Sequence, residues 1–165
     1  MNVKYKRFVA AFVNIVIICV LSLLRYSGVA TFKIGSAVPI ILLPFIIAVA
    51  MFFSDNASLL AALLAGTLMD SMSADSSWFN TLFFVVAAII CNLIGNRFFN
   101  RNLKAALYLS ALVSLIYFFF KYLIFFVFRS VDVSYDYFIL YLIPSAVYTA
   151  VFIIPFYFLE KKLAQ

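Results

Sequence analysis

Residues 57–80 read ASLLAALLAGTLMDSMSADSSWFN, and whether the first half of this stretch crosses a membrane decides how many spans the chain has. The apolar run Ala57–Met69 has only 13 residues, whereas a transmembrane helix needs about 20, with a workable range of about 17–25. The run ends in an acid, Asp70, where a full-length span would still lie in hydrocarbon. The run can therefore be a transmembrane helix, a re-entrant segment or a helix buried among others.

The composition shows which solvent surrounds most of the chain. The 165 residues are 68% hydrophobic and 11% charged, and their mean hydropathy is +1.18. A soluble domain of this size needs many more polar residues to cover its surface, so lipid is the solvent for most of this chain. We therefore predict a single membrane domain over residues 1–165, with no sizeable soluble part.

Several catalytic classes are excluded because the residues they require are missing. The chain has no histidine, which excludes Ser/His hydrolases and HExxH metalloproteases. Cys19 and Cys91 lie in apolar segments and form no redox motif, and the four glycines form no phosphate-binding loop. Asp70 and Asp75, without a third ligand or a base, are a weak basis for a Mg²⁺-dependent transferase. We predict a protein that is not an enzyme and has no cofactor and no metal site.

The hydrophobic pattern predicts an all-α integral membrane protein built as a bundle of six transmembrane helices. Four spans are long enough without argument, and a fifth is completed by the aromatic pair Trp78 and Phe79. Including the short segment, the predicted spans are 8–24, 37–53, 57–70, 78–95, 105–128 and 138–159.

The distribution of basic residues favours six spans over five. With six spans and both termini in the cytoplasm, eight basic residues are inside: Lys4, Lys6, Arg7, Arg97, Arg101, Lys104, Lys161 and Lys162. Three are then outside: Arg25, Lys33 and Arg129. If the short segment does not cross, the better orientation gives only seven against four. The positive-inside rule therefore predicts six spans in the cytoplasmic membrane with both termini inside. The net charge of +6 fits contact with anionic lipid, and no membrane-free basic face is left for nucleic acid.

Three predicted spans carry small and polar residues at helical spacing, which indicates faces turned toward other helices. On the fifth span this face is formed by Ser110, Ser114, Tyr117 and Lys121, opposite Leu112, Phe119, Leu123 and Phe126. On the third span Ala62, Gly66 and Asp70 share a face, as do Ala88 and Asn92 on the fourth. We expect Gly66 to allow a neighbouring helix close beneath Asp70.

Asp70 has three interpretations. An acid at the C-terminal end of a helix faces the negative end of the dipole and needs a compensating donor. The donor could be Lys121, which lies at a similar depth and whose lone charge in a membrane costs about 2.5–3.5 kcal/mol on insertion scales. Asp70 could instead cap its own turn through the amides of Ser71–Ser73 while Lys121 extends outward. It could also belong to an ion or substrate site.

The order of several short motifs resembles the rod-shape-determining membrane protein family MreD. The third span ends in G-x-x-x-D, Gly66 to Asp70, and a basic connector with the sequence NRFFNR follows at 96–101. A Ser-Leu-Ile-Tyr step starts at Ser114, and the last span carries PSAVYTA from Pro144 and then PFYFLEKKL from Pro155. The sequence departs from the family after Asp70, where no glycine-rich turn is present.

The resemblance implies a non-catalytic membrane scaffold of the cell-elongation machinery that makes peptidoglycan along the side wall. It implies an MreC-like single-span partner and, through it, a RodA-type glycosyltransferase, a class B penicillin-binding protein and MreB filaments. The family is also similar in fold to the substrate-binding subunits of energy-coupling-factor vitamin transporters, which gives the alternative function. Such a subunit needs an outer pocket with convergent polar groups, and few in-span polar residues are present to form one.

The first span is a candidate for contact with a partner. Its few small or polar positions besides Cys19 are Ala10, Asn14 and Ser22. An asparagine at mid-depth prefers a hydrogen bond to another helix. The sequence leaves open whether that helix belongs to this chain or to a partner.

Overall fold

A computed structural model describes residues 3–27, 38–73, 78–97, 102–124 and 138–164. The described residues form helices only, as the composition predicts. They are α1 (Val3–Tyr26), α2 (Leu42–Phe52), α3 (Asp55–Ser71), α4 (Phe79–Arg97), α5 (Leu103–Tyr122), the π-helical turn η2 (Phe138–Leu142), α7 (Ile143–Val151) and α8 (Ile153–Ala164). A helix lies in each of the six predicted ranges, and α3 fills the short range completely.

The last predicted range contains a broken helix. The turn η2 leads into α7, which ends at Val151, and α8 begins two residues later at Ile153. Pro155 explains the break, because a proline has no N–H to donate to the carbonyl of residue 151 and its ring clashes there. Pro144 lies in the first turn of α7, a position where proline is tolerated because that N–H has no partner in the helix.

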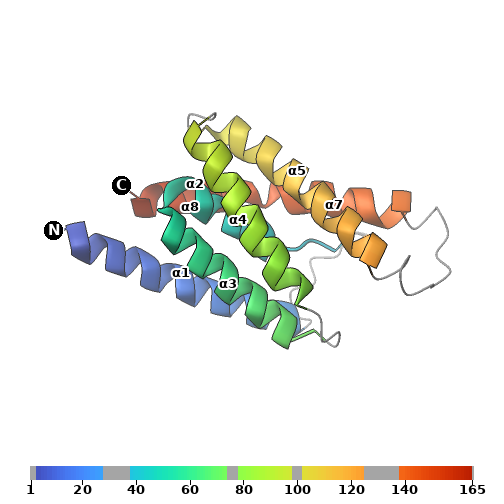
Figure 1. The fold of residues 1–165 in the computed structure, drawn as a ribbon, viewed down its shortest axis with the longest axis horizontal. Coiled ribbons are helices and arrows are strands. Elements are labelled where there is room, and N and C mark those ends of the chain that lie inside the picture. The colour runs from blue at the N-terminus through green and yellow to red at the C-terminus, as the bar shows by residue number, and fades with distance from the viewer. Residues whose placement is uncertain (1–2, 28–37, 74–77, 98–101, 125–137, 165) are drawn as a thin grey trace.

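The helices form a bundle with the N-terminus of α1 and the C-terminus of α8 at the same end (Figure 1). Among the described residues, three helical segments are long and apolar enough to cross a membrane: Phe8–Tyr26, Leu103–Tyr122 and Leu140–Ala164. Two shorter apolar helices, Leu42–Phe52 and Phe79–Ile94, accompany them. These segments define a multi-pass membrane protein. The number of crossings and the cytoplasmic location of the termini remain predictions from charge.

Helix α2 is the centre of the bundle. Every residue from Leu42 to Met51 is buried, and α2 contacts α3, α4, α5 and α8. A helix that is hydrophobic on all sides is either buried among other elements or spans a membrane. Here other helices of the chain surround α2. The predicted span 37–53 was too long as a helix, since α2 covers 42–52 and residues 38–40 are not helical.

The length of α2 has a structural consequence. Its 11 residues span about 16 Å at a rise of about 1.5 Å per residue, roughly half of a hydrocarbon core of about 30 Å. Non-helical backbone at membrane depth is tolerated where protein surrounds it. Pro39 and Ile40, which precede α2, are both buried. The central position of α2 therefore permits this irregular entry.

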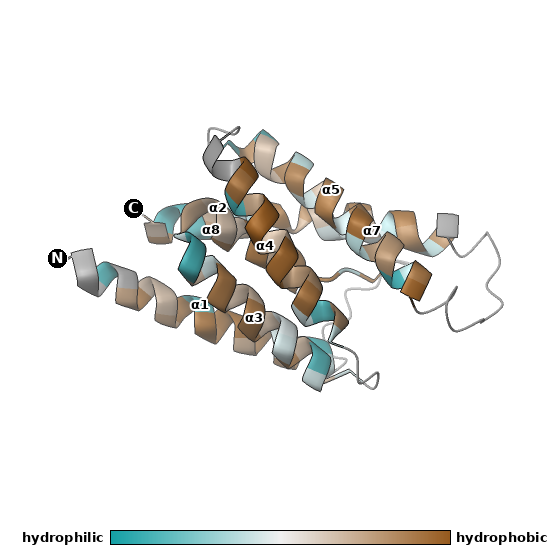
Figure 2. Ribbon diagram, in the orientation of Figure 1, coloured by the Kyte–Doolittle hydropathy of each residue, from teal (hydrophilic) through white to brown (hydrophobic). Residues whose placement is uncertain are grey.

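The predicted helix faces agree with the burial of the described residues. On α5, Ser110, Ser114 and Tyr117 are fully buried, Lys121 is half-buried, and Leu112 on the opposite face is 54% exposed. Figure 2 shows apolar residues along most of the ribbon and hydrophilic residues mainly near helix ends. The exposed apolar side chains form the surface expected to face lipid.

Of the two alternatives left open for the polar positions of the first span, the structure shows contact within this chain. Ala10, Asn14 and Ser22 are all buried inside the bundle. They share a stripe with Ile18, which is 1% exposed, because residues four apart lie on one side of a helix. The polar positions of α1 therefore serve packing within the chain.

Candidate functional site

Asp70 joins the end of α3 to the start of α4. Its Oδ1 accepts hydrogen bonds from the backbone N–H of Asn80 at 3.1 Å and from Asn80 Nδ2 at 2.8 Å. Its Oδ2 accepts from the backbone N–H of Thr81 at 2.8 Å and from Thr81 Oγ1 at 2.6 Å. The carboxylate is therefore held by four donors from two consecutive residues.

These donors lie in the first turn of α4, which begins at Phe79. The first N–H groups of a helix have no partner within it, and the dipole makes this end favourable for an anion. Asp70 supplies from α3 what an N-cap residue normally supplies from its own helix. The donors that Asp70 was expected to need are therefore groups in the first turn of α4, and the first of them belongs to the residue ten positions later in the chain.

The geometry gives Asp70 donors that neither the capping interpretation nor a direct contact with Lys121 named. The carboxylate does not cap Ser71–Ser73, since only its backbone carbonyl receives Ser73 N–H at 3.2 Å and Ser73 Oγ at 2.9 Å. The described hydrogen bonds to the carboxylate come instead from Asn80 and Thr81, and the described contacts include no direct ion pair between Asp70 and Lys121. Among the described residues, both carboxylate oxygens of Asp70 are engaged by donors of α4.

Tyr117 connects this junction to α5. Its hydroxyl donates to Asn80 Oδ1 at 2.6 Å, so Asn80 is bonded through both ends of its amide. The Tyr117 ring is fully buried and packs against the rings of Phe79, Phe83 and Phe118 at centroid distances of 5.5, 5.0 and 5.5 Å. The polar network Asp70–Asn80–Tyr117 therefore runs across three helices inside an aromatic layer.

Gly66 permits the approach of α3 and α4, as the sequence predicted. A Cβ at this position would collide with the Cα of Thr81 and lie 2.9 Å from its backbone nitrogen. Gly66 is one helical turn before Asp70, so the same close approach brings the carboxylate to the start of α4.

Asn92 makes a second bond between the same two helices. Its Nδ2 donates to Ser58 Oγ at 2.7 Å, and both side chains are buried. Ser58 in turn donates to the carbonyl of Asp55 at 2.9 Å. On α5, Ser110 and Ser114 are buried with no hydrogen-bond partner for their hydroxyls among the described residues. These two serines act through their small size at the helix interface.

Two hydroxyls of α7 bind the segment that leads into α2. Ser145 Oγ accepts from Val38 N–H at 3.1 Å, and Thr149 Oγ1 accepts from Ile40 N–H at 3.0 Å. Both hydroxyls are fully buried. They satisfy backbone groups that the irregular entry to α2 leaves without helical partners. Pro144 is exposed and acts at the start of α7, next to these contacts.

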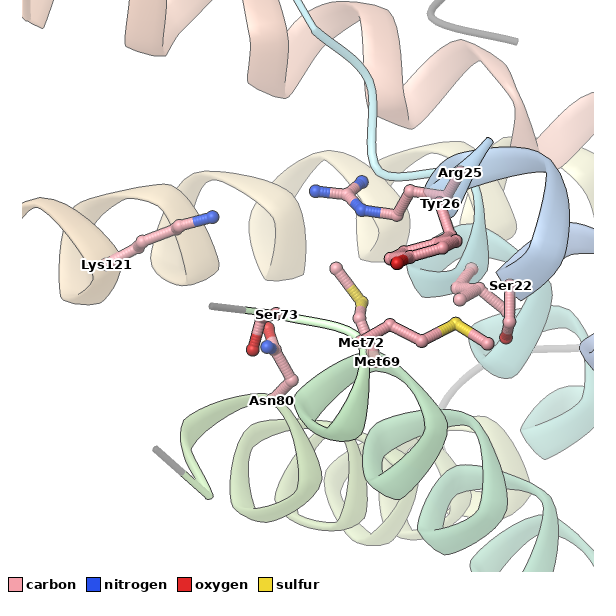
Figure 3. Close-up of a pocket in the computed structure, with 9 residues that line it drawn as sticks. Ser22, Arg25, Tyr26, Met69, Met72, Ser73, Asn80 and Lys121 are labelled. Atoms are coloured by element: carbon pink, nitrogen blue, oxygen red, sulfur yellow. The ribbon is translucent and has the colours of Figure 1, made fainter. Parts of the chain in front are cut away.

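Lys121 belongs to a pocket at the end of the bundle away from the N-terminus of α1. Its ammonium lies over the Tyr117 ring at 5.9 Å from the centroid, and Lys121 makes other interactions as well. The pocket has a volume of about 250 Å³ and is lined by residues from the ends of five helices: Ser22, Arg25, Tyr26, Leu42, Met69, Met72, Ser73, Asn80 and Lys121. Figure 3 shows Arg25 and Lys121 extending toward one another from α1 and α5.

The sequence analysis identified Asp70 and Lys121 as candidate residues but did not identify other polar residues that the fold buries or places near them. It counted Arg25 only as a loop charge, although Ser22 and Arg25 share one side of α1 at a spacing of three. It also missed Glu160, which is fully buried on α8 next to Asn14 of α1, and neither carboxylate oxygen has a well-aligned hydrogen bond from a described residue. The predicted last span ended at residue 159, one position before Glu160.

The described residues contain no group of three or more Cys, Asp or Glu side chains that could hold a metal ion. Cys19 is exposed and Cys91 is buried, and both are free. Comparison of the chain with protein-family models, with curated proteins and with solved structures found no match.

Proposed function

We propose that this multi-pass membrane protein is a non-catalytic scaffold of the cell-elongation complex that directs peptidoglycan synthesis, and that an MreC-like single-span protein binds it. The basis is the motif order that resembles the MreD family, together with one structural observation. This observation is an apolar groove on the surface of the bundle between α4 and α5.

The groove suits a transmembrane helix from a partner. It has a volume of about 370 Å³ and an almost entirely apolar lining: Phe79, Leu82, Phe83, Val86, Ala87, Ile90, Leu112, Val113, Ile116 and Phe120. From Phe79 to Ile90 it extends about 16 Å along α4 at the helical rise of about 1.5 Å per residue. Helices associate in lipid by close packing rather than by hydrophobicity, so a groove between two helices favours a third.

Co-purification from mild detergent tests the scaffold. The proposal expects a tagged chain to recover an MreC-like single-span protein. Val86→Trp should greatly reduce this recovery by filling the groove from an exposed position, 50% accessible. The matched control is Val16→Trp on α1, which is 44% exposed on another apolar surface. Equal recovery with both variants would remove the groove from the interface, and absence of such a partner from the wild-type preparation would refute the scaffold.

A second candidate is the substrate-binding subunit of a vitamin or micronutrient transporter. The observation that favours it is the pocket between the ends of five helices, with Arg25 and Lys121 in its lining. At about 250 Å³ this pocket is smaller than the roughly 300–1,000 Å³ typical of small-molecule sites. Recovery of an ATPase-linked membrane subunit together with a bound vitamin would support this candidate over the scaffold.

A further inference from the structure

We propose that the carboxyl group of Glu160 holds a proton at pH values where an exposed glutamate is ionised, and that it forms a neutral pair with the amide of Asn14. This pair joins α8 to α1, whose C- and N-terminal ends lie at the same end of the bundle (Figure 1). The inference is independent of both functions above, because it concerns how α1 is attached to the other helices.

The first observation is the burial of the carboxyl group. Glu160 is fully buried on α8, and both of its oxygens leave almost no surface for a water molecule or a metal ion to contact. An ionised carboxylate that is removed from water costs far more free energy than a neutral acid, unless a charged partner and hydrogen bonds compensate it. In such surroundings a proton is the compensating group that requires no additional space.

The second observation is a set of three buried oxygen atoms on two neighbouring side chains. Asn14 of α1 lies within reach of a side-chain hydrogen bond to Glu160. No well-aligned hydrogen bond from a described residue reaches Oε1 or Oε2 of Glu160, or Oδ1 of Asn14. A protonated carboxyl has one O–H donor, and a primary amide has both N–H donors and a carbonyl acceptor. The O–H of Glu160 can donate to Asn14 Oδ1 while Asn14 Nδ2 donates to the other carboxyl oxygen. A single proton thus gives all three oxygens a partner.

The third observation is the position of the titratable groups on the helices that α8 contacts, which are α1, α2, α5 and α7. Helix α2 carries no titratable side chain, α7 contributes the phenol of Tyr148, and α8 itself that of Tyr157.

The described cations of these helices are exposed or lie at the other end of the bundle. Lys6, Lys104, Lys161 and Lys162 are exposed, whereas Arg25 and Lys121 line the pocket at the end away from the N-terminus of α1. The side chains of Lys4 and Arg7 lie outside the described ones. Within the described part of the chain, Asn14 is the hydrogen-bonding neighbour of Glu160.

The neutral pair also accounts for the burial of Asn14. This residue lies near the middle of α1, where an asparagine in a membrane needs a hydrogen bond to another helix. Ionisable side chains inside a membrane bundle normally face its interior and pair with another polar group. Loss of the proton would remove the O–H donor and place a negative charge against Asn14 Oδ1, so the contact between α1 and α8 should then weaken.

The test uses the fact that Glu160 is the only glutamate among the 165 residues. Cell-free synthesis with glutamate carrying ¹³C at the side-chain carboxyl gives a full chain with one labelled group, whose chemical shift distinguishes an acid from a carboxylate. At pH 6 an exposed glutamate, with a pKa of about 4.3, is about 98% ionised. For the folded chain in dodecyl maltoside at pH 6 we expect the signal of the protonated acid. A carboxylate signal would overturn the proposal and indicate a cationic partner for Glu160.

A double variant provides the matched control for the label. Asp55→Glu with Glu160→Gln moves the single glutamate to an exposed position in the first turn of α3, and this label should give the carboxylate signal at pH 6. If it gives the same signal as the wild type, the label reports no special environment at Glu160, and the proposal fails.

Thermal unfolding of two single variants tests the pair itself. Glu160→Gln keeps a neutral partner for Asn14 and should melt close to the wild type, whereas Asn14→Leu removes the amide and should lower the melting temperature by several degrees. Raising the pH until the label ionises should lower the melting temperature of the wild type, because only the folded state holds the additional proton. The same change of pH should affect Glu160→Gln less. The proposal is also overturned if Glu160→Gln is destabilised as much as Asn14→Leu, since an amide replaces a neutral acid in this pair but not a carboxylate bound to a cation.

Discussion

Replacing Asp70 by asparagine tests the junction between α3 and α4 most directly. The carboxylate accepts four hydrogen bonds at 2.6–3.1 Å, and each oxygen receives one backbone N–H. An asparagine of the same shape has only one acceptor oxygen and places its own NH₂ group against the other pair of donors. In either orientation of the amide, one backbone N–H in the first turn of α4 loses its partner.

The expected cost follows from two terms. An unsatisfied buried donor costs about 1–3 kcal/mol. Loss of the negative charge at a helix N-terminus adds about 0.3–1 kcal/mol, or up to about 2 in a partly buried geometry. Asp70→Asn should therefore lower the free energy of unfolding by about 1–5 kcal/mol. Asp70→Ala should cost more because it leaves all four donors without their acceptor.

Unfolding by titration with sodium dodecyl sulfate in mixed micelles measures this difference. Trp78 is a natural probe because it immediately precedes α4 and is 69% exposed. Asp55→Asn is the matched control, since Asp55 is an exposed acid in the first turn of α3. If Asp70→Asn is no less stable than Asp55→Asn, the hydrogen bonds do not hold the two helices together. The exchange Asp70→Lys with Lys121→Asp should also fail to restore stability, because the donors to Asp70 are those of α4.

Three further substitutions probe the neighbouring contacts by the same measurement. Gly66→Ala should cost about 1–3 kcal/mol, because the added methyl forces α3 away from the backbone of α4. Tyr117→Phe should cost about 1–3 kcal/mol, because it leaves the buried amide oxygen of Asn80 without a donor. Thr149→Val should cost about 1–3 kcal/mol, because the shape is kept while the N–H before α2 loses its acceptor.

Each of these substitutions has a control in the chain. The control for Gly66→Ala is Thr67→Ala on the same helix. It removes a hydroxyl whose described hydrogen bond stays within α3, to the carbonyl of Leu64. Tyr108→Phe removes a phenolic hydroxyl from a side chain that is 75% exposed on the same helix as Tyr117. Thr149→Ser keeps the acceptor. All three should retain most of the wild-type stability, and a test variant that matches its control would show that the contact in question contributes little.

The sequence predicted which helix faces turn inward. Ser110 and Ser114 on α5, and Ala62 and Gly66 on α3, recur at intervals of four, and all are buried. Periodicity succeeds here because residue size differs between the two sides of each helix even where polarity does not. It failed for α2, which is apolar all round. Lipid and protein interior select the same side chains, so the pattern did not distinguish a central helix from a lipid-facing one.

The partners of the polar residues were not predictable by the same means. Asp70 was identified as a residue in need of donors, but those donors include backbone N–H groups beyond a turn, which no side-chain pattern marks. Thr149 and Ser145 likewise act on backbone groups of a segment more than 100 residues away. The pocket was missed because Arg25, Ser22 and Lys121 come from two helices that are not adjacent in sequence, and only the packed bundle brings them to one cavity.

The described interhelical hydrogen bonds have a common position in the fold. Asp70 binds the start of α4, Ser145 and Thr149 bind the entry to α2, and Asn92 reaches Ser58 in the first turn of α3. Backbone groups at helix starts have no partner in the helix, and lipid cannot supply one. Polar residues at these places therefore fix the register of helices that apolar packing alone would leave free to slide.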